Sequence, residues 1–452
     1  MENLFDSQSA VYKFIKKRLK KRKLVWFGTR GTDSNSLTRF EEFKDVFSII
    51  APLHSLSLSN EICLETEKGT RVDLDNYRIE NDTSPEAQEL HSKFYAALSE
   101  PSFLVTYRPA KFLSSIYFPR YNYDDDRVRY LGQFHEFQAS FEHKPWVETE
   151  LYSCGIPVIR WEYFGDDGLN LLKDRLKEGP KVIRANISDG GIGLSLINTP
   201  DDFREDWFSQ RFNFFGVADY MVPNIPLNVN ACIFRNKVVT LHPASFQLIG
   251  IPTLSNRKFG YCGNDFAQIK SLDNKILDEL EDVVVRAGKW MASKGYLGVF
   301  GVDALFYDGK IVITEINPRF QGSSDLAARI DSDLGRPDMF MMHIAAFLGA
   351  EPSESTMRLR DLVKSQMEIS HAICHNVNDS SLERNITTIN PTGQTHYELV
   401  PVKNTLVEPE AILFRTVTRG SMTDDGGSLR KPFTYLIKDA IRKMYKTSFK
   451  AS

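Results

Sequence analysis

The chain has 452 residues, of which 42% are hydrophobic and 25% are charged, and its formal net charge is −3. This length and composition predict an ordinary soluble globular protein of two or three domains, each with its own core. The nearly balanced charge argues against a general affinity for nucleic acid or for membrane surfaces.

The five cysteines are widely spread and include no Cys-x-x-Cys pair (Cys63, Cys154, Cys232, Cys262 and Cys374). An odd number of separated cysteines predicts reduced thiols and argues against a zinc site. No apolar run is long enough to span a membrane, and the first residues lack the pattern of a signal peptide. We therefore expect a cytoplasmic protein that acts on soluble substrates.

The first 135 residues are expected to form one α/β unit. Apolar residues at helical spacing predict an amphipathic helix around the basic run 16–23, whose charges either face solvent or dock an acidic partner. The apolar run 24–27 predicts a strand that enters a loop rich in Gly, Ser and Thr, with a helix from Ser36. Residues 103–107 predict a second buried strand.

Residues 142–155 predict a short helix, because Pro145 suits a first helical turn and Gly155 suits the residue just past a helix end. A strand is expected to begin at Ile156. Lys144 stands at the start of this helix, where a lysine is commonly a solvated charge.

A strand, a glycine-rich loop and a second strand are predicted over residues 181–197. The glycines of this loop are Gly190, Gly191 and Gly193. Glycines let a backbone approach phosphate oxygens, donate N–H groups to them and close over a nucleotide. Further strands are predicted over residues 217–231 and 238–248.

A long amphipathic helix is predicted over residues 264–294, where apolar residues recur at intervals of three and four. Beyond residue 351 the chain changes character. Short strand-like runs occupy residues 386–418, a polar, glycine-rich loop that we expect to be mobile follows at 421–428, and a terminal helix is predicted at 433–445. This region either caps a substrate site or only packs against the rest of the protein.

The most informative segment is residues 301–322, where two strand-like runs flank an Asp-Gly pair that favours a tight hairpin turn. If the runs pair, Asp303 and Glu315 come face to face. Because side chains alternate along a strand, Glu315, Asn317 and Arg319 share one face of the hairpin.

Carboxylate and amide oxygens are the ligands that Mg²⁺ prefers, and a guanidinium group is well shaped for phosphate oxygens. An ordinary hairpin whose acids face solvent would also fit these residues. The interval of twelve residues from Asp303 to Glu315 favours a site for magnesium and phosphate.

Residues 301–319 resemble the metal-binding end of the ATP-grasp ligases, in which an acid, a Glu-x-Asn pair on the next strand and an arginine serve a triphosphate. The order of elements from about residue 140 to residue 325 is also similar: a lysine before a helix, a glycine lid, a hinge strand, a long helix and an acidic hairpin. The resemblance implies an α/β (α+β) protein with the ATP-grasp fold. The implied domains are an N-terminal pre-ATP-grasp α/β domain at 1–135, an ATP-grasp domain at 136–350 with its lid at about 180–220 and its metal hairpin at 301–319, and a C-terminal α+β region of unassigned role at 351–452.

The resemblance also implies ATP as a cosubstrate and Mg²⁺ or Mn²⁺ as the metal. The implied metal ligands are Asp303, Glu315 and Asn317. The implied nucleotide-binding residues are Lys144, Arg184, Gly190, Gly191 and Gly193 at the phosphates, Tyr220 and Met221 at the base, and Asn228 near the ribose or the phosphates. The implied catalytic residues are Arg319 and Arg184. The family usually has a lysine in place of Arg184 and an acid in place of Asn228.

Segments 260–264 and 317–322 further resemble ATP-grasp amino-acid ligases of secondary metabolism. This resemblance implies an ADP-forming ligase that activates an amino-acid carboxylate as an acyl phosphate and joins it to an amine in natural-product biosynthesis. Two alternatives stay open: loading of an amino acid onto the thiol of a carrier protein, and nucleotide binding without catalysis. The implied partners are a small-molecule amino acid, an amine acceptor and, in the first alternative, the carrier protein. Family members are often homodimers, and no nucleic acid or membrane partner is expected.

Overall fold

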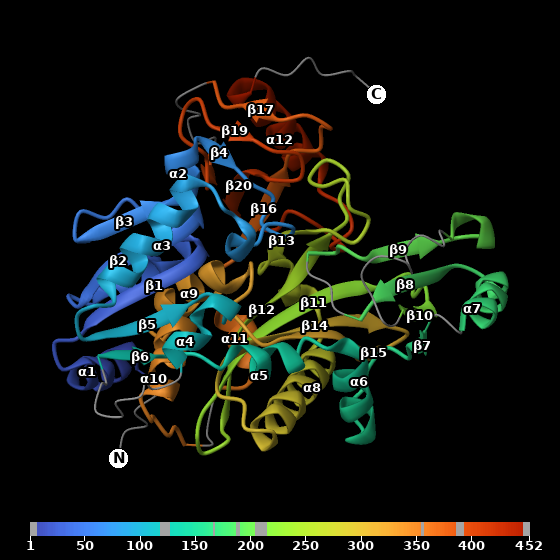
Figure 1. Cartoon of the computed structure of the whole chain (residues 1–452). Helices are drawn as coiled ribbons and strands as arrows, with labels where there is room; N and C mark the ends of the chain where they lie inside the picture. Colours follow the sequence, from blue (N-terminus) through green and yellow to red (C-terminus); the bar gives the residue numbers. More distant parts are fainter. Residues whose placement is uncertain are drawn as a thin grey trace.

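The structure is a computed structural model, and it describes residues 7–117, 127–165, 168–186, 190–203, 215–353, 357–385 and 393–445. An N-terminal unit, a long central sheet and a small sheet follow one another across the molecule (Figure 1). The last elements of the chain, coloured red, lie above the junction of the first two parts. In the described ranges, no helix combines the length and the apolar character needed to cross a membrane.

The N-terminal unit is a parallel sheet of five strands in the order β3-β2-β1-β5-β6. Its strands are β1 (Lys23–Arg30), β2 (Phe43–Ile50), β3 (Asn60–Cys63), β5 (Ser102–Thr106) and β6 (Val128–Tyr130). The helices of this part are α1 (Gln8–Leu19), α2 (Leu64–Lys68), α3 (Pro85–Ala97), α4 (Ser114–Tyr117) and α5 (His135–Ser140). Both predicted strands are confirmed, as β1 and β5. The predicted amphipathic helix is confirmed as α1, which buries Val11, Ile15 and Leu19.

The helix expected from Ser36 is wrong. A 3-10 helix occupies Gly31–Arg39, directly after β1. Its short polar side chains bond to nearby backbone groups, and Ser34 Oγ donates to the carbonyl of Gly31 at 2.7 Å. Such local hydrogen bonds compete with those of an α-helix, so the segment winds more tightly.

The central sheet has eight antiparallel strands in the order β15-β14-β11-β12-β13-β16-β20-β18. Its strands are β11 (Ile225–Ile233), β12 (Val239–Ile249), β13 (Tyr261–Asp265), β14 (Gly298–Tyr307), β15 (Lys310–Asn317), β16 (Ile369–His375), β18 (Thr395–Glu398) and β20 (Ile412–Arg419). The predicted hairpin is confirmed as β14 and β15, in which Asp303 pairs directly with Glu315. Strands β16, β18 and β20, which follow residue 350, belong to the same sheet as β11 to β15.

The long helix is α8 (Asn274–Ser293), and the expected start at Asn264 is wrong. Residues 261–265 instead form β13, which pairs with both β12 and β16. The helix begins where Asp273 caps it, accepting hydrogen bonds from the backbone N–H groups of Lys275 and Ile276 at 2.9 and 3.1 Å. The apolar face of α8 packs with the strands of the hairpin in one core.

The small sheet, here called the lid sheet, has the order β7-β10-β8-β9. Its strands are β7 (Glu162–Phe164), β8 (Lys181–Ala185), β9 (Leu194–Ile197) and β10 (Phe215–Asp219), and the helices beside it are α6 (Lys144–Ser153) and α7 (Leu169–Arg175). The predicted short helix is confirmed as α6, and the predicted strand–loop–strand as β8 and β9. The strand expected from Ile156 is reduced to a single bridge between Val158 and Ile313. Residues 187–189 and 204–214 of the predicted lid lie outside the described residues.

The C-terminal elements bind to both larger parts. They comprise α9 (Ser324–Asp333), α10 (Met339–Phe347), α11 (Leu359–Ser365), β17 (Leu382–Glu383), β19 (Leu406–Val407) and α12 (Lys431–Met444). Strand β19 pairs with β17 and with β4 (Thr70–Arg71) of the N-terminal unit. The predicted terminal helix is confirmed as α12, whereas residues 386–392 of the predicted strand-like runs lie outside the described residues.

Candidate active site

A cavity of about 740 Å³ lies where the N-terminal unit, the lid sheet, the central sheet and the C-terminal segment meet. Its size falls in the range of roughly 300–1,000 Å³ that is typical of small-molecule sites. With the exception of Gly193, all of the predicted site residues line this cavity: Lys144, Arg184, Gly190, Gly191, Tyr220, Met221, Asn228, Asp303, Glu315, Asn317 and Arg319. The fold therefore brings together residues that are far apart in the sequence.

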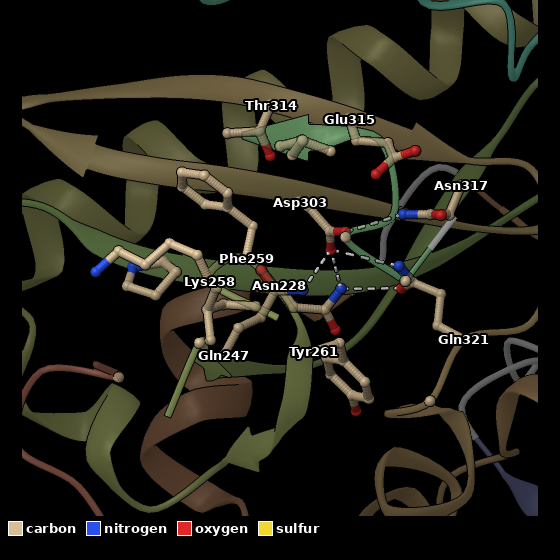
Figure 2. Close-up of a pocket in the computed structure, with 18 of the residues that line it drawn as sticks. Asn228, Gln247, Lys258, Phe259, Tyr261, Asp303, Thr314, Glu315, Asn317 and Gln321 are labelled. Carbon is tan, nitrogen blue, oxygen red and sulfur yellow. Dashed lines mark hydrogen bonds between the residues drawn. The ribbon is translucent and has the colours of Figure 1, made fainter. Parts of the chain in front are cut away.

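The two acids of the hairpin lie in the wall of this cavity (Figure 2). Asp303 is held by side-chain amides: its Oδ1 accepts from Asn228 and Gln247 at 2.7 and 2.9 Å, and its Oδ2 accepts from Asn317 at 3.0 Å. Burial, together with the charge of Glu315, raises the pKa of Asp303 to about 6. A carboxylate whose charge is disfavoured by burial and by a neighbouring acid, as that of Asp303 is, would be stabilised by a cation between the two side chains.

The chemistry of these donors fits a magnesium ion. In the described parts of the chain, no group of three or more His, Cys, Asp or Glu side chains is placed to hold a metal. The set formed by Asp303, Glu315 and Asn317 has two acids and one amide. This composition suits Mg²⁺, which is commonly bound by one or two carboxylates and completed by substrate phosphates and water.

Lys144 reaches Glu315 from the first turn of α6. Its side chain is only 6% exposed, and its Nζ forms an ion pair with Glu315. A lysine at a helix start is usually solvated, but here the helix carries it into the cavity wall. A cation in this position can serve either the carboxylate or a phosphate group bound beside it.

Arg184 lies on β8 and is held on three sides. Its guanidinium pairs with Glu148, donates to the hydroxyl of Tyr163 at 2.8 Å and lies over the ring of Trp161 at 3.8 Å. Its Nη1 also donates to the carbonyl of Thr314 at 3.3 Å, which connects the lid sheet to the acidic hairpin. Arg184 is therefore a fixed positive charge in the cavity wall.

The glycine loop between β8 and β9 approaches two other segments closely. Gly190 and Gly191 have φ angles of +56° and +79°, which favour glycine. A Cβ atom on Gly190 would lie 2.1 Å from Asp75 Oδ2, and one on Gly191 would lie 2.4 Å from the carbonyl oxygen of Phe259. Packing against the backbone of Phe259 therefore requires glycine at residue 191, and backbone conformation favours glycine at both positions. Gly193 lies outside the cavity wall, and its carbonyl accepts from the Ala185 N–H at 3.0 Å.

The residues predicted for the base and the ribose lie at different places in the cavity. Tyr220 and Met221 follow β10, and the Tyr220 N–H donates to the carbonyl of Pro180 at 3.1 Å. Asn228 instead stands directly opposite Asp303 on the neighbouring strand. It belongs to the surroundings of the acids, where it is fully paired within the amide network.

Arg319 follows β15 and lines the cavity. Its side chain is mostly buried, its Nη1 donates to the carbonyl of Phe320 at 3.1 Å, and its Nε lies 3.7 Å from a carboxylate oxygen of Glu142. The structure thus places this guanidinium in the wall of the same cavity as the two acids of the hairpin.

Two glutamines of the site were not predicted from the sequence. Gln247 on β12 and Gln321 after β15 both donate to Asp303 Oδ1, at 2.9 and 3.4 Å. Gln321 also accepts from Asn228 at 2.9 Å. Gln321 lies close in sequence to the acidic hairpin at 301–319. Gln247 lies near Asp303 only because β11 pairs with both β12 and β14. No local sequence signal identifies such a residue.

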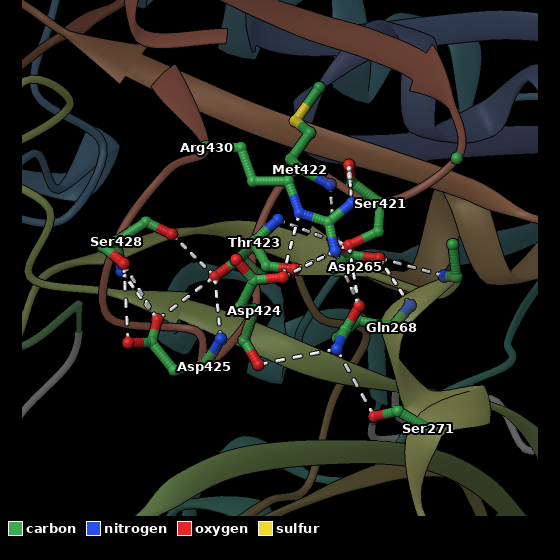
Figure 3. A network of polar contacts seen from close by, with 12 residues as sticks. Asp265, Gln268, Ser271, Ser421, Met422, Thr423, Asp424, Asp425, Ser428 and Arg430 are labelled. Carbon is green, nitrogen blue, oxygen red and sulfur yellow. Dashed lines mark hydrogen bonds and ion pairs between the residues drawn. The ribbon is translucent and has the colours of Figure 1, made fainter. Parts of the chain in front are cut away.

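A segment of the C-terminal region completes the wall. Asp425, Gly426 and Gly427 line the cavity, and a Cβ atom on Gly426 would lie 2.4 Å from the carbonyl oxygen of Gln247. Buried Asp265 anchors this segment by accepting from Ser421 Oγ, Met422 N and Thr423 N at 2.7, 2.7 and 3.2 Å (Figure 3). The loop at 421–428 is thus built into the site by defined hydrogen bonds.

Substituting Asp265 by Ala is expected to destabilise the protein by about 2–4 kcal/mol, because several buried donors lose their acceptor. Urea unfolding measures this change. Asp424 in the same loop is a matched control: its exposed side chain pairs with Arg430, and such surface pairs contribute only about 0–1 kcal/mol. Equal destabilisation by Asp265→Ala and Asp424→Ala would contradict the role assigned to Asp265.

Comparison with known proteins identifies the class of this site. Residues 174–323 match the sequence model of the ATP-grasp domain. The matched residues contain the glycine loop, the central strands β11 to β14 and the acidic hairpin. The chain therefore contains an ATP-grasp domain. No curated protein sequence matches the chain.

Solved structures extend the likeness to nearly the whole chain. Biotin carboxylase from Campylobacter jejuni, described as a β,γ-ATP complex, has a TM-score of 0.61 at 16% identity over 93% of this chain and 91% of that one. The biotin carboxylase domain dimer of 2-oxoglutarate carboxylase from Hydrogenobacter thermophilus, with MgADP, ADP and bicarbonate, has a TM-score of 0.62 at 13% identity over 88% and 86% of the two chains. N5-carboxyaminoimidazole ribonucleotide synthetase from Thermotoga maritima has a TM-score of 0.52 at 11% identity over 94% and 99%. The predicted ATP-grasp fold is confirmed.

Proposed function

We propose that this protein is an ATP- and magnesium-dependent, ADP-forming ligase that activates an amino-acid carboxylate as an acyl phosphate and joins it to an amine. The observation that carries the proposal is the placement of Asp303 opposite Glu315, with Asn317, in one cavity with Lys144 and Arg319. The nucleotide complexes among the solved structures of the same fold support ATP as the cosubstrate.

The proposed reaction first activates the carboxylate, which is unreactive toward amines in water. A carboxylate does not condense with an amine in water, because hydroxide is a poor leaving group. Transfer of the γ-phosphoryl group of ATP to the carboxylate oxygen gives an acyl phosphate and ADP. The amine then attacks the acyl carbon, and phosphate leaves as the amide bond forms. The nucleophile belongs to the second substrate, so the protein itself needs none.

The protein would contribute charge and exclusion of water. Magnesium bound by Asp303, Glu315 and Asn317 would supply neutralisation of charge on the phosphoryl oxygens. Lys144 and the N–H groups of the glycine loop would hold phosphate oxygens, and Arg319 would stabilise charge on the transferred group. Closure of the loop would keep water from the acyl phosphate.

The remaining assignments complete the nucleotide site. The segment at Tyr220 and Met221 would receive the base. Arg184, fixed by Glu148, would face the α and β phosphates from β8. Asn228 would act through Asp303, by donating to its carboxylate and holding it in place, and not at the ribose.

The test is an ADP-release assay with a panel of amino acids, as single substrates and in pairs, with and without Mg²⁺. We expect magnesium-dependent ADP formation that requires a carboxylate, and a hydroxamate when hydroxylamine replaces the amine. Mass spectrometry of the paired reactions should detect the amide product. A folded sample that forms no ADP with any carboxylate would contradict the proposed function.

A further inference from the structure

Arg30, the last residue of β1, is a buried cation that the proposed reaction does not use. It lines the cavity and is only 4% exposed. Its Nε donates to Asp33 at 2.9 Å. Within the described residues, its two terminal nitrogens make no hydrogen bond, although a buried arginine normally uses this pair of donors.

The position of Arg30 is one where parallel sheets bind ligands. Strand β1 lies between β2 and β5. The sheet continues from β2 to β3 on one side and from β5 to β6 on the other, so the strand order changes direction at β1. Ligands of such sheets bind at the carboxyl ends of the strands, at this change of direction. Arg30 stands at the carboxyl end of β1, and its guanidinium carbon lies 6.0 Å from the ring centre of Tyr107, just after β5.

The same place adjoins the acidic hairpin. The N–H of Phe320 donates to the carbonyl of Tyr107 at 3.3 Å, which holds the turn after β15 against the end of β5. Tyr261 lies near both groups: burial raises the pKa of its hydroxyl, and Arg30 lowers that pKa while Asp303 raises it. Arg30 therefore faces the same cavity as the hairpin, beside Tyr261.

One edge of the Arg30 guanidinium is open to an anion. Asp33 occupies only the Nε side of the guanidinium, so the edge formed by the two terminal nitrogens remains for a ligand. Two further arginines, Arg108 and Arg319, line the cavity from the segments that follow β5 and β15. A planar pair of N–H donors matches the two oxygens of a carboxylate.

We propose that Arg30 binds a carboxylate that does not react. The two substrates together then carry two carboxylates, one that is activated and one that Arg30 binds. This inference rests on the proposed function, in which one carboxylate is activated beside the hairpin. The second carboxylate has two possible sources. It belongs either to the acid that is activated, as in a dicarboxylic amino acid, or to the amine acceptor, as the free carboxylate of a second amino acid.

The test measures binding to the protein loaded with MgADP by isothermal titration calorimetry. L-Glutamate is compared with L-glutamine, and L-alanine with L-alaninamide, so that each pair differs only in a carboxylate. We expect the wild type to prefer the carboxylate form of one pair by about 10–100-fold, the size expected for a charged hydrogen-bonded contact. The pair that shows the preference identifies the source.

Three variants connect that preference to Arg30. Arg30→Gln should abolish it, and Arg30→Lys should reduce it, because lysine keeps the charge without the paired donors. The double variant Arg30→Gln/Asp33→Asn also removes the acid that would be left unpaired, so a folding defect is separated from a binding defect. Arg160→Gln, which removes an exposed arginine outside the cavity, is the charge-matched control and should retain the preference.

A preference that survives in Arg30→Gln, or its absence from both pairs in the wild type, would overturn this inference. Binding of inorganic phosphate that depends on Arg30, without any carboxylate preference, would overturn it as well. The proposed function is judged separately by ADP release. A protein that shows the carboxylate preference but forms no ADP would retain the Arg30 site and refute the ligase.

Discussion

Replacing Glu315 by Gln is expected to lower kcat for ADP formation by about 10³-fold or more, while the fold and nucleotide binding are retained. The exchange keeps the volume of the side chain but removes one of the two charges that face the proposed metal. Charge stabilisation of the transferred group by a bound metal is among the largest contributions to phosphoryl transfer. Steady-state ADP release measures the loss, and circular dichroism and ADP titration check the fold and the nucleotide site.

Glu368→Gln is the matched control for this substitution. Glu368 is exposed, pairs with Lys270 at 3.2 Å and does not line the cavity. An exposed pair of this kind contributes about 0–1 kcal/mol, so the control should retain full activity. Turnover of Glu315→Gln within tenfold of the wild type would contradict the site, since the metal would then have to lie elsewhere.

Replacing Arg319 by Met is expected to lower kcat by about 10²–10³-fold, the effect typical of losing one donor to a developing negative charge. Arg319→Lys should lose less activity, because it keeps the charge without the paired donors. Methionine fills much of the same volume, and the nearby Glu142 is partly exposed, so the fold should tolerate the change. Measuring kcat and the KM for ATP separately distinguishes loss of chemistry from loss of binding.

A fall in nucleotide affinity with kcat unchanged would contradict the role proposed for Arg319 and would assign it to ATP binding alone. Arg160→Met serves as the control, because Arg160 is an exposed arginine that does not line the cavity. Its kinetic constants should match those of the wild type.

The acidic hairpin could be predicted from the sequence because its signals are local. The Asp-Gly turn sets the pairing of β14 with β15, and this pairing brings Asp303 opposite Glu315. The same holds for the short helix that carries Lys144, which Pro145 and Gly155 delimit. Each of these features depends on residues that are close together in the chain.

The support of Asp303 could not be predicted, because it comes from other strands. Asn228 is opposite Asp303 only because β11 pairs with β14, and Gln247 reaches it from β12 beyond β11. The placement of Asn228 near the ribose or the phosphates rests on the resemblance alone. The order of strands in a sheet depends on long-range packing, for which a single sequence gives little information.

Pairing between distant strands also explains why the predicted helix start at Asn264 is wrong. Asn264 and Asp265 belong to β13, which lies in the middle of the central sheet. Pairing with β16, more than 100 residues later, outweighs local helical spacing. The C-terminal region likewise gave no motif, although its strands extend the central sheet and its 425–427 segment lines the cavity.

The most direct measurement is a crystal structure of the protein with ADP and Mn²⁺, in which anomalous scattering locates the metal. We expect a Mn²⁺ peak bound by oxygens of Asp303, Glu315 and Asn317 and by the terminal phosphate of the nucleotide, with Lys144 turned toward a phosphate group. A nucleotide bound in the cavity with the metal elsewhere, or with these three side chains directed away from it, would contradict the account.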